Sequence, residues 1–276
     1  MIASARLYVC TARGVLRIGS ETPLIGDFVE IFVTDANRQE ASIDAILPRK
    51  NSLPRPAVAN VDQVIITACE KNPSFNPGLL DRFLVMAEGI DAEVLICINK
   101  ASGPADFIEP YIVAGYNVVY TDALSGFGIG QLKERMAGKL SLFAGPSGVG
   151  KSSLINALVP GLGLATGELS QKTSRGKHTT RHTEIFPLGD LLEDGRCFDT
   201  PGFSSVDCAG LERSELAYRF REIAAHQGGC RFINCSHISE AGCAVKAQVG
   251  VGIHSARYES YVKMAEDNEK RDVRRK

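Results

Sequence analysis

The stretch of this sequence with the most specific chemistry runs from residue 145 to residue 153. It reads Gly145-Pro146-Ser147-Gly148-Val149-Gly150-Lys151-Ser152-Ser153, which fits the pattern G-x-x-x-x-G-K-S. Glycines in such a loop let backbone N–H groups converge on phosphate oxygens. The Lys151 ammonium would neutralise the outer phosphates and assist catalysis, and the Ser152 hydroxyl would ligate Mg²⁺. The stretch therefore predicts a binding site for a nucleoside triphosphate.

The residues on either side of this loop have the character that such a site requires. Residues 140–144 are mostly apolar and predict a short strand, while residues 153–158 predict a helix that ends before Pro160 and Gly161. A helix N-terminus attracts anions, so the order strand, loop, helix would complete the phosphate site. The alternative interpretation is a glycine-rich turn with only a structural role.

Three further short motifs follow predicted strands. Asn99-Lys100-Ala101-Ser102 lies where a guanine-recognition loop N-K-x-D would occur, and Thr121-Asp122-Ala123 lies where the supporting S-A loop would occur. Asp199-Thr200-Pro201-Gly202 matches D-x-x-G, in which the aspartate acts on Mg²⁺ and the glycine N–H meets the γ-phosphate. Each motif is short, but their joint occurrence at strand ends predicts a GTPase.

The order of these motifs differs from that of an ordinary GTPase. The base-recognition loops precede the phosphate loop here, whereas they normally follow it. The sequence therefore predicts a circularly permuted domain, which a doubly wound sheet tolerates because domain termini usually lie close together at the surface. The permutation would also place the chain after Asp199 at the exit of the domain, so that nucleotide state could be relayed to the C-terminal segment.

A basic stretch between the phosphate-loop helix and Asp199 predicts a switch segment. Residues 172–182 hold Lys and Arg side chains but no acidic one. Thr179 or Thr180 would meet Mg²⁺ and the γ-phosphate, and the sequence does not choose between them. Phe203 stands where many GTPases have a glutamine that orients water, so we expect slow intrinsic hydrolysis and assign that catalytic role to His178. Alternatively, His178 only contacts RNA or supports the loop.

Three cysteines and one histidine cluster toward the C-terminus. These are Cys230, Cys235, His237 and Cys243. Three thiolates and one imidazole predict a closed, tetrahedral structural zinc site that leaves no position for a catalytic water. Such a site would stabilise a segment that has little core of its own. The alternative is three free cysteines and a surface histidine.

The elements that must position these residues change in character along the chain. Short β-like runs at residues 6–11, 15–18, 27–33 and 42–47 predict a small barrel of the oligonucleotide-binding (OB) type, or a barrel that only packs against its neighbour. Residues 49–56 predict a linker, because the two prolines in it disfavour helix.

From Val58 onward, strands alternate with helices. Apolar runs predict strands at 64–68, 94–98 and 117–121, and apolar faces predict helices at 79–87, 107–114 and 129–137. This succession predicts a doubly wound, mostly parallel sheet covered on both faces, with ligand loops at the carboxyl ends of its strands. A final helix from Ala256, with Tyr258, Tyr261, Val262 and Ala265 on or near one face, ends in a basic tail suited to a phosphate backbone.

Composition sets broad limits on location and partners. The chain of 276 residues is long enough for two or three domains, and its net charge of −1 excludes a globally basic nucleic-acid binder, so any RNA contact must come from local patches. No apolar run approaches the roughly 20 residues of a membrane span, and the N-terminus lacks a signal-peptide pattern. We therefore expect a cytoplasmic protein without a membrane partner, most simply a monomer.

Taken with these motifs, the sequence closely resembles the circularly permuted ribosome small-subunit-dependent GTPases, the RsgA family. The resemblance covers nearly the whole chain and is most specific in the phosphate loop and in the following stretches: Arg49-x-x-x-Leu53-x-Arg55-Pro56-x-Val58-Ala59-Asn60-Val61-Asp62-Gln63, Gly176-Lys177-His178-Thr179-Thr180 and the cysteine–histidine cluster. It implies an OB-like barrel at residues 1–57, a permuted GTPase domain at 58–207 and a helical zinc-binding domain at 208–276. It also implies action in late maturation of the small (30S) ribosomal subunit, whose rRNA is a partner and which stimulates GTP hydrolysis.

Two residues depart from the pattern of the family. Ser102 replaces the aspartate that accepts two hydrogen bonds from guanine, a loss of about 1.5–3 kcal/mol of binding free energy. Asp122 replaces a serine, and we hypothesise that its carboxylate reads the base from the opposite side of the pocket. The alternative is that Asp122 caps the next helix or turn.

The sequence thus predicts a GTP hydrolase that binds GTP or GDP, Mg²⁺ and one structural Zn²⁺. The magnesium ligands would be Ser152, a switch threonine and Asp199. Two rival interpretations remain open at this point. One is a P-loop ATPase or another NTPase, which only Ser102 favours, and the other is an RNA-binding assembly factor with little turnover, which Phe203 permits.

Overall fold

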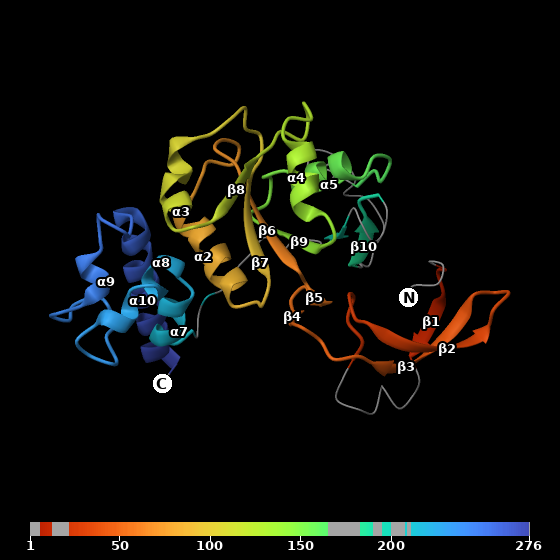
Figure 1. The fold of residues 1–276 in the computed structure, drawn as a ribbon, viewed down its shortest axis with the longest axis horizontal. Helices are drawn as coiled ribbons and strands as arrows, with labels where there is room; N and C mark the ends of the chain where they lie inside the picture. Colours follow the sequence, from red (N-terminus) through yellow and green to blue (C-terminus); the bar gives the residue numbers. More distant parts are fainter. Residues whose placement is uncertain are drawn as a thin grey trace. The chain divides into compact units, whose positions relative to one another are not determined.

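The computed structural model describes residues 6–12, 22–164, 183–189, 195–199, 208 and 211–275, with the backbone alone at residue 199 and at residues 271–275. The chain divides into two compact units, residues 1–61 and residues 62–276 (Figure 1). Among the described residues, no helix combines the length and the hydrophobicity that crossing a lipid bilayer requires.

The first unit contains a small sheet and a short hairpin. Strands β1 (Val9–Ala12), β2 (Val29–Asp35) and β3 (Glu40–Ile46) form the sheet in the order β1-β3-β2. Strands β4 (Ser52–Pro54) and β5 (Ala57–Ala59) pair antiparallel, so the segment 49–56, expected to be a linker without helix, contains no helix but includes a strand and the turn of a hairpin. The prolines are tolerated because such a short edge pairing needs few backbone donors. The closed barrel itself stays a prediction.

The second unit is built on a six-stranded sheet. Its strands are β6 (Gln63–Ala68), β7 (Glu93–Ile98), β8 (Asn117–Tyr120), β9 (Leu140–Ala144), β10 (Glu184–Pro187) and β11 (Arg196–Asp199). They lie in the order β10-β11-β9-β6-β7-β8, and all neighbours are parallel except β10 and β11. The mostly parallel sheet expected from the sequence is confirmed, and β6, β7 and β9 are almost completely buried, as strands covered on both faces must be.

The centre of this sheet is the strand that leads into the phosphate loop. Leu142 of β9 pairs with Val64 of β6 on one side and with Phe198 of β11 on the other. From β9 the later strands lie on one side and the earlier strands on the other, so the strand order reverses there. In doubly wound sheets a ligand binds at such a switch point, beyond the carboxyl ends of the strands.

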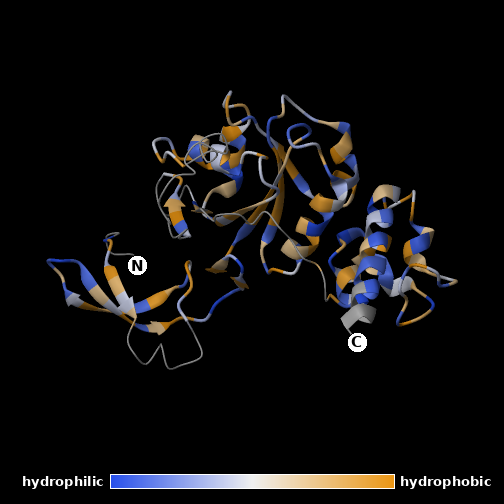
Figure 2. Cartoon of the chain, turned by 180° about the vertical axis from the view of Figure 1, so that it is seen from behind, coloured by the Kyte–Doolittle hydropathy of each residue, from blue (hydrophilic) through white to orange (hydrophobic). Residues whose placement is uncertain are grey.

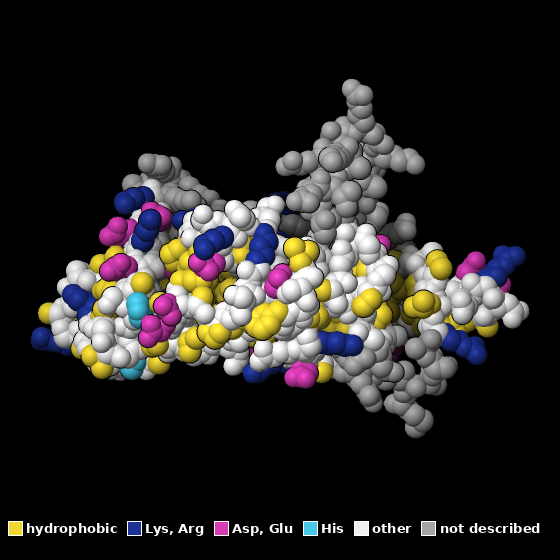
Figure 3. Space-filling model, turned by 90° about the horizontal axis from the view of Figure 1, so that it is seen from above, with side chains coloured by type: hydrophobic (Ala, Val, Ile, Leu, Met, Phe, Trp, Pro, Cys, Tyr) yellow, Lys and Arg dark blue, Asp and Glu magenta, His cyan; other side chains and the backbone are white. Residues whose placement is uncertain are grey.

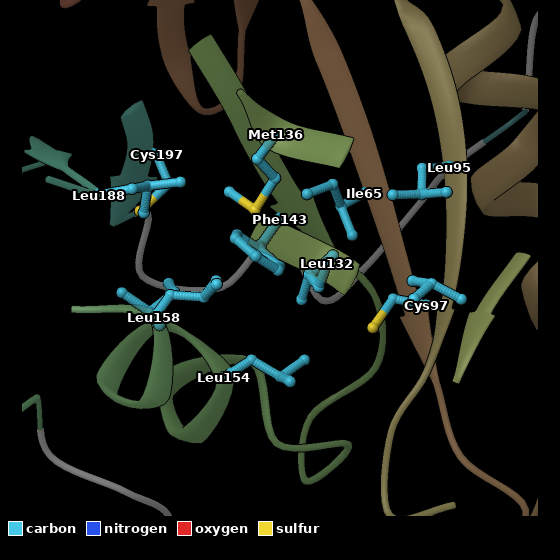
Figure 4. Packing of buried hydrophobic residues seen from close by; sticks show 12 residues of the cluster. Ile65, Leu95, Cys97, Leu132, Met136, Phe143, Leu154, Leu158, Leu188 and Cys197 are labelled. Atoms are coloured by element: carbon cyan, nitrogen blue, oxygen red, sulfur yellow. The ribbon is translucent and has the colours of Figure 1, made fainter. Parts of the chain in front are cut away.

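Helices cover both faces of the sheet (Figure 1). One face carries α2 (Pro77–Glu88), the 3₁₀ turn η1 (Asp106–Ile108) and α3 (Glu109–Val113), and the other carries α4 (Ile129–Met136) and α5 (Lys151–Leu158). Side chains of α4 and α5, including Leu132, Met136 and Leu154, pack against Ile65 and Phe143 of the sheet (Figure 4). Helix α2 begins at an N-cap, where the Asn76 side chain accepts a hydrogen bond from the Leu79 N–H at 3.0 Å.

The C-terminal segment consists of short helices packed around one long helix. They are α7 (Arg213–Tyr218), α8 (Arg221–Ala224), the 3₁₀ turn η2 (Gln227–Gly229), α9 (Ala244–Ala247) and α10 (Ser255–Arg275). Hydrophobic and polar residues alternate along α10, while the central strands of the sheet are mainly hydrophobic (Figure 2). Tyr261 and Ala265 of α10 are fully buried, as its apolar face predicts, and pack with Phe220 and Ile223.

Candidate functional site: a nucleotide pocket and a cysteine–histidine cluster

The phosphate loop connects β9 to α5, as the sequence predicts. Gly145, Gly148 and Gly150 adopt φ values of 135°, 83° and 96°, a region that side-chain-bearing residues rarely enter. A Cβ atom at Gly145 would lie 2.2 Å from the carbonyl oxygen of Thr67, because the loop crosses the end of β6. The loop therefore needs glycine both for its backbone conformation and for its close approach to the sheet.

The Lys151 ammonium lies against the carbonyls of this loop. Its Nζ donates hydrogen bonds to the oxygens of Gly145 at 2.7 Å and Pro146 at 2.8 Å. Burial lowers the pKa of Lys151 to about 8. A buried ammonium with depressed pKa is poised to gain a negatively charged partner, which is what a phosphate supplies. Ser152 and Ser153 occupy the first turn of α5, beside the loop.

Asn99 joins three separate motifs through hydrogen bonds of its side chain. Its Nδ2 donates to the carbonyl oxygen of Val149 in the phosphate loop at 2.9 Å. Its Oδ1 accepts hydrogen bonds from the Ala123 N–H at 3.2 Å and the Thr121 hydroxyl at 3.3 Å. Only 2% of the Asn99 surface is exposed, so these bonds form in a low-dielectric environment where a missing partner is costly.

Lys100 extends this connection to a loop that the sequence analysis missed. Its Nζ donates to the carbonyl oxygen of Gly148 at 2.8 Å and also to the carbonyl oxygen of Asn72. Asn72 belongs to the segment between β6 and α2, which we call the 69–76 loop. Parallel topology places this loop at the same edge of the sheet as the other ligand loops, and that rule would have identified it.

The two base loops that carry the unusual residues Ser102 and Asp122 lie next to each other. Ala101, next to Ser102, donates its N–H to the carbonyl oxygen of Thr121 at 2.9 Å, so the two base loops adjoin. Oδ1 of Asp122 accepts a hydrogen bond from the Leu124 N–H at 3.1 Å, and this bond lowers the pKa of the Asp122 carboxyl. In this structure the Asp122 carboxylate therefore caps the turn that follows it, which is the alternative role weighed above.

The remaining predicted ligands of the nucleotide are placed only in part. The backbone of Asp199 ends β11, one residue after Phe198, which pairs with Leu142 next to the phosphate loop. Asp199 thus lies at the same edge of the sheet as Lys151. His178, Thr179, Thr180 and Gly202 lie outside the described residues.

The cysteine–histidine cluster converges in space. The ligand atoms of Cys230, Cys235, His237 and Cys243 all lie within 4.8 Å of one another. His237 Nδ1 is 3.4 Å from the Cys230 Sγ and 3.6 Å from the Cys243 Sγ, and these two sulfurs are 3.9 Å apart. A tetrahedron with Zn–S bonds of about 2.3 Å has edges of about 3.8 Å. The four side chains therefore fit one tetrahedral zinc ion.

Neighbouring groups hold the backbone that carries these ligands. The Tyr258 hydroxyl donates to the carbonyl oxygen of His237 at 2.7 Å, and the Tyr261 hydroxyl donates to that of Ser236 at 2.8 Å. The Glu240 carboxylate accepts a hydrogen bond from the Ser236 N–H at 2.7 Å, and hydrogen bonds from Ser236 lower the pKa of Glu240 to about 2. The ligand loop is thus fixed both internally and by α10.

A second feature that the sequence does not predict is a buried arginine in α10. Arg257 is 1% exposed and forms ion pairs with Asp81 of α2 and with Glu222 of α8. Its guanidinium also lies over aromatic rings, 4.6 Å from the centroid of Phe220 and 5.1 Å from that of Tyr111. The only signal in the sequence is its spacing of four residues from Tyr261, which puts both on one face of a helix.

The chain is similar in sequence to a known protein family over more than half of its length. A sequence model of the family described as RsgA GTPase matches residues 46–209. The chain is 44% identical over 264 residues to the small ribosomal subunit biogenesis GTPase RsgA of Alkaliphilus metalliredigens (strain QYMF), covering 94% of this chain and 89% of that protein. It is 43% identical over 272 residues to the protein of the same name from Caldanaerobacter subterraneus subsp. tengcongensis, covering 96% and 90% of the two chains.

Two solved structures are also similar over most of their length. YjeQ from Thermotoga maritima superposes with a TM-score of 0.78 at 37% identity, covering 94% of this chain and 89% of that one. YloQ, described as a circularly permuted GTPase, superposes with a TM-score of 0.79 at 34% identity, covering 97% and 88%. The permuted arrangement expected from the order of the motifs is thereby confirmed.

Proposed function

Because this chain belongs to the RsgA GTPase family, we propose that it hydrolyses GTP to GDP and phosphate during late maturation of the small ribosomal subunit. The relatives described above are named small ribosomal subunit biogenesis GTPases, and these names support the proposal. In this proposal the subunit stimulates hydrolysis, and its rRNA is the surface to which the protein binds. A ribosomal partner places the protein in the cytoplasm.

One observation carries the proposal for this chain. Asn99 hydrogen-bonds to Val149 in the phosphate loop and to Ala123 in the second base loop, although these residues are far apart in the sequence. A phosphate loop alone would serve many NTPases. A base-recognition asparagine anchored to that loop supports a pocket that holds phosphates and base together, as a GTPase requires.

The roles of the pocket residues follow from their chemistry. Lys151 and the loop amides would hold the phosphates, and Ser152, a switch threonine and Asp199 would ligate Mg²⁺. Bound Mg²⁺ supplies charge neutralisation at the phosphates. We assign the cysteine–histidine cluster to one structural Zn²⁺, because its donor set is complete without water.

The distribution of charge on the described surface limits how the protein could contact RNA. On the face shown in Figure 3, Lys and Arg side chains are interspersed with acidic and apolar ones among the coloured residues. Such a surface lacks the broad positive field of a general nucleic-acid binder. Affinity for rRNA would then come from a few basic segments, of which residues 172–182 are one candidate.

The test of this proposal is phosphate release from GTP with and without purified small subunits. We expect slow release by the protein alone and at least about a hundredfold acceleration by the subunits, as other GTPases show with activating partners. Lys151→Met is the control that should abolish both rates. Absence of stimulation would favour the alternative of an RNA-binding factor with little turnover.

Competition among nucleotides tests the base. We expect GTP to displace bound GDP far better than ATP does, and equal displacement would favour a less specific NTPase. Comparing GTP with XTP for Asp122→Asn then tests whether the Asp122 carboxylate replaces the one missing at Ser102. Unchanged GTP preference in that variant would leave Asp122 with only its turn-capping role.

The phosphate-release assay with and without small subunits also tests the role of His178. We propose that His178 orients the attacking water when the subunit is bound. His178→Ala should then lose subunit-stimulated hydrolysis while it retains GDP affinity. A stimulated rate equal to that of the unchanged protein would rule out this assignment.

A further inference from the structure

Arg257 is a buried arginine that lies between two parts of the second unit, the C-terminal helices and the helix α2 that covers the sheet. Its helix, α10, belongs to the C-terminal segment, while Asp81 lies in the second turn of α2, which covers the sheet. Glu222 of α8 forms the other ion pair, with its Oε1 2.7 Å from the Arg257 Nε. Replacing a buried ion pair by apolar groups is often neutral or stabilising, so such a cluster is poor evidence for a purely stabilising role. It is better explained by the geometry that it imposes.

On one side, Arg257 is linked to the cysteine–histidine cluster. Tyr258 and Tyr261 lie within one turn of it on α10, and their hydroxyls donate to the carbonyls of His237 and Ser236 at 2.7 Å and 2.8 Å. Any displacement of the ligand loop would therefore act on the same turn of α10 that carries the guanidinium.

On the other side, Arg257 is linked to the nucleotide pocket. Asp81 is near the start of α2, and the 69–76 loop leads directly into that start. The carbonyl oxygen of Asn72 in this loop accepts from the Nζ of Lys100, which also donates to Gly148 of the phosphate loop. A helix of twelve residues thus connects the Lys100 contact to the Arg257 contact through its first turns.

Tyr111 of α3 supports the same end of α2. Its hydroxyl donates to the carbonyl oxygen of Pro77 at 3.3 Å, and its ring lies beneath the Arg257 guanidinium. The first two turns of α2 therefore have three partners: Tyr111 at Pro77, Arg257 at Asp81 and the N-cap residue Asn76. Their position is determined by these partners together.

From these contacts we propose that Arg257 is a positioning residue that fixes the start of α2 and the 69–76 loop against the nucleotide pocket. Zinc and nucleotide would then bind cooperatively, each stabilising the arrangement that the other requires. This inference rests on the nucleotide and zinc sites proposed above. It adds a specific path between them that runs through α2.

Arg257→Met in the full chain is the direct test, and Arg221→Met is its matched control. Arg221 of α8 also joins α2, through a 2.7 Å ion pair with Glu88, and its guanidinium lies 4.3 Å from the centroid of the Tyr116 ring. Glu88, however, is the last residue of α2, at the end remote from the 69–76 loop. Each variant loses one guanidinium that joins the C-terminal helices to α2. Only Arg257→Met loses it near the start of α2, where the 69–76 loop leads in.

The measured quantity is the Kd for GDP, well below the melting temperature of each variant. We expect Arg257→Met to raise this Kd about fivefold or more and Arg221→Met to leave it within about twofold, with bound zinc retained in both. Equal effects of the two substitutions, or no effect of either, would overturn the proposal.

The reciprocal measurement distinguishes positioning from simple loss of stability. Saturating GDP should slow the release of zinc to a chromogenic chelator in the unchanged protein and in Arg221→Met, but not in Arg257→Met. Protection by GDP that persists in Arg257→Met would contradict the proposed path. A variant that was merely less stable would release zinc faster but would still be protected.

Asp81→Asn provides a second route if Arg257→Met does not fold. This change leaves the Arg257–Glu222 ion pair in place and removes the carboxylate charge on the α2 side of the contact, so the Kd for GDP should again rise about fivefold or more. An unchanged Kd in Asp81→Asn would count against the proposal. If the unchanged protein binds no guanine nucleotide, the proposed function fails, whereas normal binding in both the unchanged protein and these variants removes only the inference about Arg257.

Discussion

At the scale of single residues, the polar side chains of the nucleotide pocket are oriented by backbone groups rather than by solvent. Asn99 is bonded on both ends of its amide, and Lys151 is held over two carbonyls of the phosphate loop. Pre-oriented groups lose little conformational entropy when a ligand arrives. They also carry a cost, because Asn99 is buried and Lys151 half-buried, so each depends on its hydrogen-bond partners.

The depressed pKa of Lys151 leads to a pH dependence of nucleotide binding. In the free protein this pKa is about 8, so the ammonium loses its proton as pH rises through that value. Phosphate beside it favours the charged form and raises the pKa, so binding takes up a proton above about pH 8. We expect the affinity for GDP to fall by up to about tenfold per pH unit there. Titration calorimetry in buffers of different ionisation enthalpy measures both effects.

Lys151→Arg is the control for this prediction. A guanidinium stays protonated throughout the range, so any pH dependence left in this variant belongs to the nucleotide or to other residues. The same profile in both proteins would show that the Lys151 proton is not involved.

The Asn99 side chain should contribute both to the stability of the fold and to the affinity for GDP. Asn99→Ala leaves the Val149 carbonyl and the Ala123 N–H without a partner, which should lower the free energy of unfolding by about 1–3 kcal/mol. Because the same bonds align the phosphate and base loops, the Kd for GDP should rise at least about tenfold, a loss of about 1.4 kcal/mol. Urea unfolding and nucleotide titration measure the two effects.

A second asparagine separates these two effects. Asn156 of α5 makes comparable bonds to the backbone of Leu164, with its Nδ2 2.9 Å from the oxygen and its Oδ1 2.8 Å from the nitrogen. Asn156→Ala should cost similar stability but change the Kd for GDP by less than about threefold. If both variants bind GDP equally weakly, Asn99 has no special role in the pocket.

At the scale of elements, the C-terminal helices differ from those that cover the sheet. Helices α7, α8 and α9 are only six, four and four residues long, and isolated helices of such lengths are not stable in water. They are held by packing on α10 and by the cysteine–histidine cluster beside them. The stability of this segment should therefore depend on the metal.

Cys243→Ser tests that dependence. Loss of a thiolate should remove bound zinc and lower the melting temperature of the second unit by at least about 5 °C. The three remaining donors cannot complete the tetrahedral coordination of a structural zinc ion. Calorimetry and elemental analysis of zinc measure the two outcomes. Cys208→Ser is the matched control, since Cys208 is a buried cysteine of the same hydrophobic cluster outside the ligand set. Zinc content unaffected by Cys243→Ser would exclude the site.

At the scale of the whole molecule, the described residues that form the nucleotide pocket all lie in the second unit, residues 62–276. That unit has its own sheet, and its two hydrophobic clusters consist entirely of its own residues. A unit with its own core is expected to fold independently. The described residues of the first unit form a separate sheet and hairpin, and we expect this unit to serve recognition rather than nucleotide chemistry.

Removal of residues 1–61 tests this division of labour. The shortened chain should bind GDP with a Kd within about twofold of the full protein, a difference of less than about 0.5 kcal/mol. It should at the same time lose most of the stimulation by small subunits. Nucleotide titration and the phosphate-release assay measure these outcomes, and a shortened chain that folds but no longer binds GDP would show that the first unit takes part in the pocket.

The sequence alone determined the features that depend on local order along the chain. The sequence predicts the phosphate loop, the alternation of strands and helices, and a metal site at Cys230, Cys235, His237 and Cys243. It can do so because periodicity, glycine content and ligand spacing are short-range properties. The order of the motifs was also sufficient to predict the permutation, because the base-recognition loops precede the phosphate loop here, whereas they follow it in an ordinary GTPase.

Only the tertiary structure decided which polar groups meet. The bond from Asn99 to Val149 spans fifty residues, and the ion pair from Arg257 to Asp81 spans one hundred and seventy-six. No local pattern encodes such contacts, because they depend on how the sheet and the helices pack together. The carboxylate of Asp122 is a different case: its bond to the Leu124 N–H is local, but the residue type alone permits base recognition as well as turn capping, and the structure shows the capping bond.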